Sequence, residues 1–242
     1  MNTLGVILAR GGSQGLKSKH LLPLLGRAVI GHTFAHVHAA QRLTRVVVSS
    51  DCPRILALAA ANGFDVVRRP AELATDTASV QDVLLHALDA IEVRTTARFD
   101  AVATLYGNVP VRPPGIIDEA ILLLESSHCD SVRSFCPVGK WHPAWLSSLD
   151  GDRAIALRPG SIHRRQDLEP LFLHDGAIVV SSRASMEAGR ANRSDPHAFF
   201  GTDRRAVRTE FGAAVEVDTR RDLLLAEAIL RDQATLLEAS AA

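Results

Sequence analysis

Residues 3–19, TLGVILARGGSQGLKSK, decide the fold class of this chain. The apolar run 3–8 predicts a short β-strand that leads into a loop with three glycines. Glycines let backbone N–H groups approach an anion closely, and Arg10, Lys17 and Lys19 add positive charge. The stretch therefore predicts a phosphate-binding loop at the end of a buried strand.

Two common phosphate-loop motifs are excluded by spacing. A Walker A loop needs a glycine directly before its lysine, and Leu16 stands there before Lys17. A Rossmann fingerprint needs a glycine two positions before Gly12, where Arg10 stands. Pro23 also argues against a helix that starts directly after the loop. From the glycines alone, a flexible surface turn remains the alternative.

Apolar runs alternate with helical patterns along the chain, which is typical of a mostly parallel sheet flanked by helices. We therefore expect an α/β fold in one domain, residues 1–242. Asp51 followed by Pro53 predicts a helix N-cap and a helix start. The expected strands are 3–8, 44–50, 65–67, 99–105, 131–135, 176–180 and 213–217, and the expected helices are 53–62, 79–91, 116–126 and 219–230.

The alternating pattern breaks within residues 137–173, which we interpret as an inserted arm. Trp141, Trp145, Leu146 and Leu149 are too apolar for a solvated linker. We expect these side chains to pack against a partner subunit.

Composition excludes several classes of partner. The 27 basic and 27 acidic residues give a formal net charge of zero, so no overall field attracts nucleic acid or an anionic membrane. The three cysteines form no paired metal spacing and are typical of a reducing compartment. No basic leader precedes the first apolar run, which has the length of a strand. We expect a soluble, cytoplasmic protein.

A pair of carboxylates closes the last expected strand. Glu216 and Asp218 are two residues apart, so both side chains would project from the same side of a strand and reach one hard cation. The alternative is that Asp218 caps the following helix and Glu216 lies on the surface. The histidines and cysteines show no zinc spacing, and no serine-nucleophile motif occurs in the sequence.

Four further motifs occur in the same order as in a known family: RPAELATDTAS at 69–79, RRQDL at 164–168, GAI at 176–178 and VEVDT at 215–219. Together with the loop, they resemble the acylneuraminate cytidylyltransferases, also called CMP-sialic acid synthetases. The resemblance implies a Rossmann-like nucleotidyltransferase fold and a homodimer whose arm reaches the partner's sugar site. It also implies Mg²⁺-dependent transfer of CMP from CTP to an acidic nine-carbon sugar, with release of pyrophosphate.

The resemblance also implies roles for individual residues. Catalysis would fall to Arg10, Lys19 and Asp218, with Asp218 and Glu216 holding the metal. The nucleotide would be bound by Ala9, Gly11, Gly12, Ser13, Gln14, Lys17, Arg69, Ser79, Tyr106 and Asn108. The sugar would be bound by Arg165, Gln166, Asp175, Gly176, Phe199 and Phe200.

Some positions depart from the family pattern. The family usually has lysine at Gln14 and asparagine at both His20 and Asp175, and residues 106–112 differ from its usual segment. These departures leave two alternatives open. One is a nucleotidyltransferase for another sugar or sugar phosphate with a different nucleotide, and the other is a catalytically silent nucleotide-binding homologue.

Overall fold

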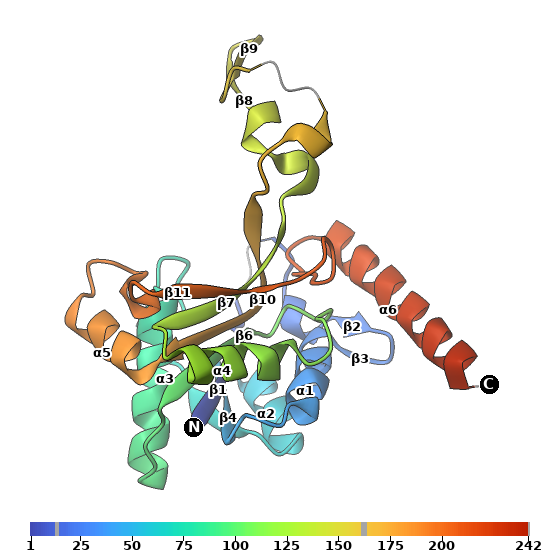
Figure 1. The fold of residues 1–242 in the computed structure, drawn as a ribbon. Helices are drawn as coiled ribbons and strands as arrows, with labels where there is room; N and C mark the ends of the chain where they lie inside the picture. Colours follow the sequence, from blue (N-terminus) through green and yellow to red (C-terminus); the bar gives the residue numbers. More distant parts are fainter. Residues whose placement is uncertain (13–14, 161–163, 242) are drawn as a thin grey trace.

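A seven-stranded sheet forms the centre of the molecule (Figure 1). The computed structural model describes residues 1–12, 15–160 and 164–241. Neighbouring strands are parallel except at β10, which is antiparallel to both β6 and β7. In sheet order the strands are β11 (Arg204–Arg208), β7 (Ser131–Pro137), β10 (Phe172–Ser182), β6 (Ala101–Tyr106), β1 (Thr3–Leu8), β4 (Arg45–Ser50) and β5 (Asp65–Arg68). The predicted α/β class is confirmed.

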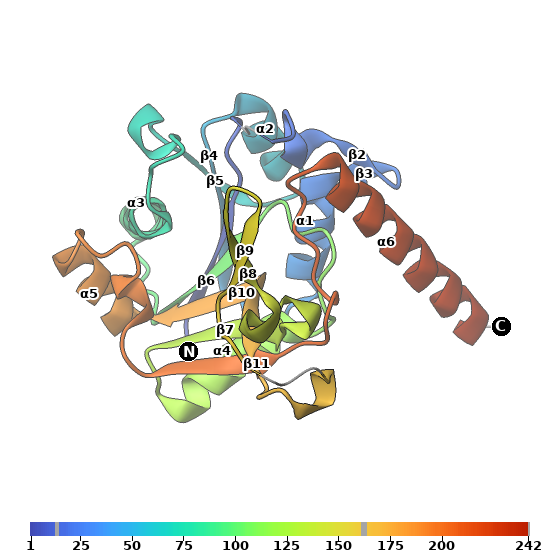
Figure 2. The same cartoon turned by 90° about the horizontal axis from the view of Figure 1, so that it is seen from above.

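Helices cover both faces of this sheet (Figure 2). One core lies between the sheet and three helices, α1 (Val29–Ala39), α2 (Pro53–Ala61) and α4 (Ile116–Ser127). The opposite core is formed with α3 (Val80–Thr95) and α5 (Arg183–Ala191). The strands are apolar on both sides because both of their faces are buried.

The strand order places a switch point beside β1. The chain passes from β1 through β4 to β5 on one side, and then returns to β6 on the other side of β1. In open α/β sheets, ligands bind at such a point, beyond the carboxyl ends of the strands. Leu8 and Tyr106 end β1 and β6 at this position.

A long projection rises from the sheet between β7 and β10 (Figure 1). It carries a two-stranded hairpin, β8 (Ser147–Asp150) and β9 (Arg153–Ala156), at its tip. Both hairpin strands are exposed along their whole length.

The C-terminal helix α6 (Arg220–Ala241) packs against the body by its first turns and then extends away from it (Figure 1). Leu223, Ala226 and Ile229 join a small apolar cluster that also includes Leu16 and Val217. This cluster ties the start of α6 to the loop that follows β1. In the described part of the chain, none of the helices combines the length and hydrophobicity needed to span a bilayer.

Two local predictions were wrong. Residues 213–217 form no strand, since their pairing with the segment after β6 is limited to an isolated bridge between Val215 and Val111 and one bond from the Val217 N–H to the Asn108 carbonyl. The sheet ends instead with β11, a strand whose exposed arginines gave no apolar pattern. Asp51 does not cap α2 either, because Cys52 occupies the N-cap position and the Asp51 carboxylate accepts a hydrogen bond from Gly11.

Candidate nucleotide-binding site

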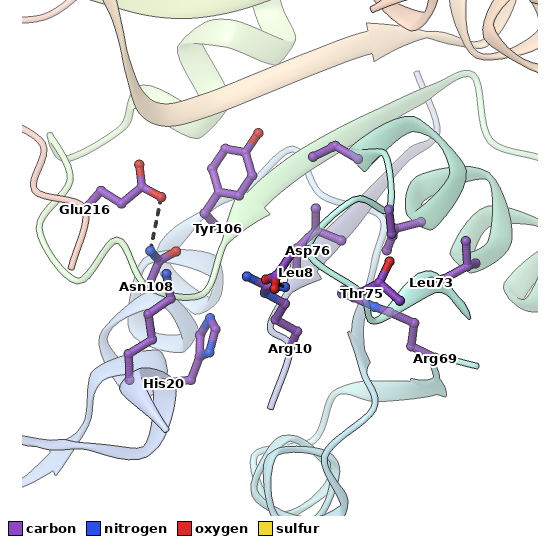
Figure 3. A pocket seen from close by; sticks show the side chains of 14 residues that line it. Leu8, Arg10, His20, Arg69, Leu73, Thr75, Asp76, Tyr106, Asn108 and Glu216 are labelled. Carbon is purple, nitrogen blue, oxygen red and sulfur yellow. Dashed lines mark hydrogen bonds and ion pairs between the residues drawn. The ribbon is translucent and has the colours of Figure 1, made fainter. Parts of the chain in front are cut away.

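A cavity of about 200 Å³ opens at the switch point (Figure 3). Its walls come from the ends of β1 and β6, the segment after β1, the segment between β5 and α3, and Glu216. Its lining combines charged and polar side chains with apolar ones. Three cations, Arg10, Lys19 and Arg69, border it.

Two of these cations are paired with carboxylates from distant parts of the chain. Arg10 forms an ion pair with Asp76, and the Nζ atom of Lys19 lies 2.5 Å from Oδ1 of Asp218. Both pairs are partly exposed, so solvent screens them and each adds little stability. Both cations are therefore held at the cavity by weak pairs that an anionic ligand can replace.

Arg69 is held more rigidly. It is only 7% exposed, and its guanidinium donates hydrogen bonds to the hydroxyl and the carbonyl of Ser49. Burial lowers the pKa of Arg69 to about 10, so the side chain remains charged at neutral pH. A fixed, desolvated cation of this kind is suited to electrostatic stabilisation of phosphate.

The loop after β1 is anchored by its neighbours. Ala9 is fully buried, and its N–H donates to the Ser49 carbonyl. The N–H of Gly11 donates to Oδ1 of Asp51 at 2.7 Å, so Asp51 orients the loop. Gly12 is exposed, with no atom within 4 Å of a built Cβ position, whereas Ser13 and Gln14 lie outside the described residues.

Gly15 brings the loop against the C-terminal segment. A Cβ atom at Gly15 would lie 2.7 Å from the carbonyl oxygen of Asp218, closer than real side chains come. Glycine is therefore required for this approach. It places Asp218 beside Lys19.

The carboxylates of Glu216 and Asp218 do converge, although no strand holds them. Nδ2 of Asn108 donates to Oε1 of Glu216 at 3.1 Å and to Oδ1 of Asp218 at 3.2 Å. Asn108 therefore gathers both acidic groups on one side of the cavity. Within the described residues, no group of three or more His, Cys, Asp or Glu side chains is placed to hold a metal.

A buried arginine supports this wall. Arg112 is 3% exposed and donates to the carbonyl oxygens of Tyr106, Val109 and Ala177. These bonds fix the turn that carries Asn108. Burial raises the pKa of Tyr106 to about 12, so its hydroxyl keeps its proton at the cavity edge.

His20 lines the cavity and was not among the predicted site residues. It is 3% exposed, and its Nδ1 atom has no hydrogen-bond partner within the described residues. Burial, followed by the charge of Lys19, lowers the pKa of His20 from 6.5 to about 3. The imidazole is therefore neutral at physiological pH.

The neutral state of His20 predicts a loss of stability in acid. Because its pKa is lower in the folded than in the unfolded protein, stability is complete above about pH 6.5 and falls as the pH drops towards 3. Between pH 7 and pH 4 we expect His20→Asn to lose roughly 3 kcal/mol less unfolding free energy than the wild type. Urea unfolding at both pH values measures this difference, with exposed His128→Asn as the control. Equal losses in the wild type and His20→Asn would contradict the prediction.

Other predicted nucleotide residues lie around this cavity without lining it. Ser79 is the N-cap of α3, where its hydroxyl accepts a hydrogen bond from the Asp82 N–H. Its neighbours Ala78 and Val80 line the cavity instead. Lys17 is exposed and does not border it.

The predicted sugar residues are dispersed within one chain. Arg165 and Gln166 are exposed on the projection. Phe199 is 2% exposed in the core beside α3, and Phe200 lies beneath the guanidinium groups of Arg133 and Arg204. The nucleotide cavity is lined by none of these four predicted residues.

Asp175 and Gly176 lie closer to the site. Asp175 accepts hydrogen bonds from the hydroxyls of Ser134 and Thr209 and from the Ala177 N–H, so it fixes the irregular part of β10. Both carboxylate oxygens of Asp175 are bonded within the chain, and its role as a sugar ligand stays a prediction. A Cβ atom at Gly176 would lie 3.6 Å from Oε2 of Glu216.

The arrangement has a clear chemical capacity. The cavity lies at the carboxyl ends of parallel strands, and both cations and carboxylates line it. Its three cations, Arg10, Lys19 and Arg69, are suited to holding a polyphosphate. Sequence reasoning did not include His20, whose position in the cavity depends on tertiary packing, or Leu73, which lies in the 69–79 motif. Thr75 and Asp76 belong to the 69–79 motif, which was the available signal.

Comparison with solved structures defines the class of fold. The chain is similar to the structure of CMP:2-keto-3-deoxy-manno-octonic acid synthetase complexed with CTP, with a TM-score of 0.71 and 19% identity over 96% of this chain and 100% of that one. At this identity the likeness shows the fold, a Rossmann-like nucleotidyltransferase fold. Residues 4–144 match the family model described as Cytidylyltransferase. The chain belongs to the cytidylyltransferase family.

Curated relatives extend the similarity along the chain. An N-acylneuraminate cytidylyltransferase from Streptococcus agalactiae serotype III is 30% identical over 229 residues, covering 93% of this chain and 52% of the relative. A CMP-N,N'-diacetyllegionaminic acid synthase from Legionella pneumophila is 27% identical, covering 95% of this chain and 97% of the relative. The chain thus spans about half the length of the streptococcal relatives it matches.

Proposed function

We propose that this protein transfers CMP from CTP to the anomeric hydroxyl of an acidic sugar of the sialic-acid type, releasing pyrophosphate. The observation that carries the proposal is the cavity lined by Arg10, Lys19, Arg69 and Glu216. Asp218 lies beside this cavity, where it forms an ion pair with Lys19. The names of the relatives from Streptococcus and Legionella support the choice of nucleotide and of sugar class.

The reaction needs no covalent enzyme intermediate. The sugar hydroxyl oxygen bonds to the α-phosphorus of CTP, the bond to the bridging oxygen breaks, and pyrophosphate leaves while the hydroxyl proton passes to solvent. Negative charge grows on the phosphoryl oxygens and the leaving group. Arg10, Lys19 and Arg69 stabilise this charge, and the two ion pairs with Asp76 and Asp218 hold their cations ready before the nucleotide binds.

The residues present fit a magnesium ion. Glu216 and Asp218 supply hard oxygen ligands, and the shared contact with Asn108 shows that both carboxylates reach one point. Mg²⁺ is commonly held by one or two carboxylates together with substrate phosphates, which agrees with a site of only two acidic groups. When bound, the ion would neutralise phosphate charge.

We also propose that the projection forms a homodimer. Its exposed apolar side chains include Trp141 and Leu149, which are 57% and 75% exposed. Such a surface is typical of a protein interface. In the dimer, Arg165 and Gln166 would reach the partner's sugar site. Sedimentation equilibrium tests this proposal, which a monomer at micromolar concentration would contradict.

The function is tested by incubating the protein with CTP, Mg²⁺ and a panel of sialic, pseudaminic, legionaminic and deoxyoctulosonic acids. We expect acceptor-dependent release of pyrophosphate and a CMP-sugar detected by mass spectrometry. Absence of both across the panel would contradict the proposal. Thermal stabilisation by GTP, UTP or ATP, but not by CTP, would instead favour another nucleotide. Tight CTP binding without turnover, unchanged in Gln14→Lys, would indicate a silent homologue.

A further inference from the structure

A second cavity, of about 350 Å³, lies at the β11 end of the sheet. We call it the arginine cavity. Its volume is typical of a site for a small organic molecule and exceeds what a single ion needs. Within the described residues its lining contains no carboxylate and shares no residue with the nucleotide cavity. The side chains that matter are those of Arg133, Arg204, Arg205, Arg208, Phe135 and Phe172.

Three of these arginines project from one face of two neighbouring strands. In the parallel pair of β7 and β11, Arg133 lies opposite Ala206 and Phe135 lies opposite Arg208. Paired residues, and residues two apart on one strand, project from the same face of a sheet. Arg133, Arg204 and Arg208 therefore project together. The methyl side chain of Ala206 leaves space between them.

The helices leave this part of the sheet open. Arg133 pairs with Val179 of β10, which belongs to the core formed with α3 and α5. Among the described residues, that core includes none from β7 or β11. The opposite face of these two strands is buried, because Val132 and Val207 belong to the core formed with α4. The arginine cavity thus lies where the helical layer on its own face ends.

The same three arginines lack a counter-charge. Arg205 is paired with both carboxylate oxygens of Asp203, whereas Arg133, Arg204 and Arg208 form no ion pair within the described residues. Nε of Arg133 is buried and has no hydrogen-bond partner in that same part of the chain. Burial and the charge of Arg204 both lower the pKa of Arg133, as expected when like charges are held together. A bound anion would relieve this repulsion.

Aromatic rings orient two of the guanidinium groups. Cζ of Arg133 lies 4.5 Å from the ring centroid of Phe200 and 4.9 Å from that of Phe135. Cζ of Arg208 lies 4.9 Å from the Phe172 centroid. Such contacts stabilise a cation without using its N–H groups, which remain free to bind an oxyanion in a bidentate manner.

Protection of a sheet edge explains only part of this charge. Charged side chains on an edge strand discourage pairing with other molecules, and β11 is an edge strand. Arg133, however, lies on β7, which has neighbours on both sides. Edge protection also gives no reason to fix Arg204, whose Nε donates a hydrogen bond of 2.7 Å to the Gly201 carbonyl. The grouping of these side chains needs another explanation.

We propose that the arginine cavity is a binding site for a small phosphate ester of the sugar-phosphate class. Arg133 and Arg204 hold the phosphate, and the organic part of the ligand lies against Phe135 and Phe172. A phosphate monoester carries close to two negative charges at neutral pH, so it matches several uncompensated guanidinium groups better than a carboxylate does. The ligand is neither the nucleotide nor the acceptor of the proposed CMP transfer, so the inference goes beyond that function.

Calorimetric titration of the full chain with ribose 5-phosphate tests the site, and inorganic phosphate and ribose are titrated in parallel. We expect ribose 5-phosphate to bind more tightly than either. Arg133→Gln and Arg204→Gln should each weaken its binding by about tenfold or more, because each removes a charge-assisted hydrogen-bond donor. Arg133→Lys keeps the charge and should restore part of the loss. Arg231→Gln, which changes an exposed arginine of α6, is the matched control.

The nucleotide cavity also attracts phosphate, so Lys19→Ala is titrated as well. We expect Lys19→Ala to bind ribose 5-phosphate as the wild type does. Binding that is lost in Lys19→Ala but kept in Arg133→Gln and Arg204→Gln would place the ligand in the nucleotide cavity and overturn the inference.

Each other outcome is decisive. Failure of ribose 5-phosphate to bind the wild type at millimolar concentration, or binding no tighter than that of inorganic phosphate, would overturn the inference. Variants that change the dimer content and leave ribose 5-phosphate binding intact would assign these arginines to a subunit interface and also overturn it. If Arg133→Gln does not fold, Arg204→Gln on the edge strand decides. The titrations involve no CMP transfer, so the proposed function and this inference fail separately.

Discussion

Replacing Lys19 by alanine is expected to lower kcat/KM for CMP transfer by about a hundredfold to a thousandfold. The Lys19 ammonium borders the nucleotide cavity and lies 2.5 Å from Oδ1 of Asp218. In the proposed reaction, its removal takes away a positive charge that would stabilise the leaving pyrophosphate. Initial rates at saturating acceptor, with CTP varied, measure the effect.

The fold should survive the Lys19→Ala substitution. Asp218 is 57% exposed and becomes hydrated when its partner is lost, so the cost in unfolding free energy should stay below about 1 kcal/mol. Arg231→Ala on α6 removes an exposed cation that does not line the cavity and should retain wild-type rates. Near-native turnover in Lys19→Ala would remove this residue from the proposed site.

Asp218→Asn is expected to lower kcat by about two to three orders of magnitude, since in the proposed site Asp218 would hold the metal ion, which supplies several kcal/mol of transition-state stabilisation. Asparagine preserves the shape of the side chain and can still accept the hydrogen bond from Asn108. The change therefore isolates the charge. The Mg²⁺ concentration for half-maximal activity should rise as well, and a magnesium titration at fixed CTP measures it.

Asp232→Asn, on the exposed part of α6, is the control for Asp218→Asn and should leave the magnesium response unchanged. The double variant Lys19→Ala/Asp218→Asn should lose much less activity than the product of the two single losses, because residues that act as a unit are not additive. An unchanged magnesium requirement in Asp218→Asn would show that the proposed metal site is incorrect.

Much of the fold follows from local patterns. The buried strands β1, β4 and β6 are continuous apolar runs, and Pro53 and Ser79 stand at the starts of α2 and α3. These patterns can be recognised in a single sequence because they depend on the burial of strand residues and on the capping of free backbone N–H groups at a helix start. The loop after β1 was identified for the same reason, since its glycines and cations are adjacent in the chain.

Residues with two plausible local roles were harder to assign. Asp51 before Pro53 suggests a helix cap, yet its carboxylate orients the loop through Gly11. Residues 213–217 alternate like a strand, yet they form only an isolated bridge, at Val215. In both cases the local pattern favours one structure and contacts with a distant part of the chain favour another. A single sequence does not show which of the two is more stable.

The sequence by itself determined the α/β class, the glycine-rich basic loop after the first strand and the pairing of carboxylates at 216 and 218, because each depends on neighbours within a few residues. Only the tertiary structure decided that Asn108 joins those carboxylates, that His20 is buried in the cavity wall, and that Arg133 meets Arg204. These contacts cross strands far apart in the chain. Their energies come from burial and from charges brought together by the fold, which no local pattern records.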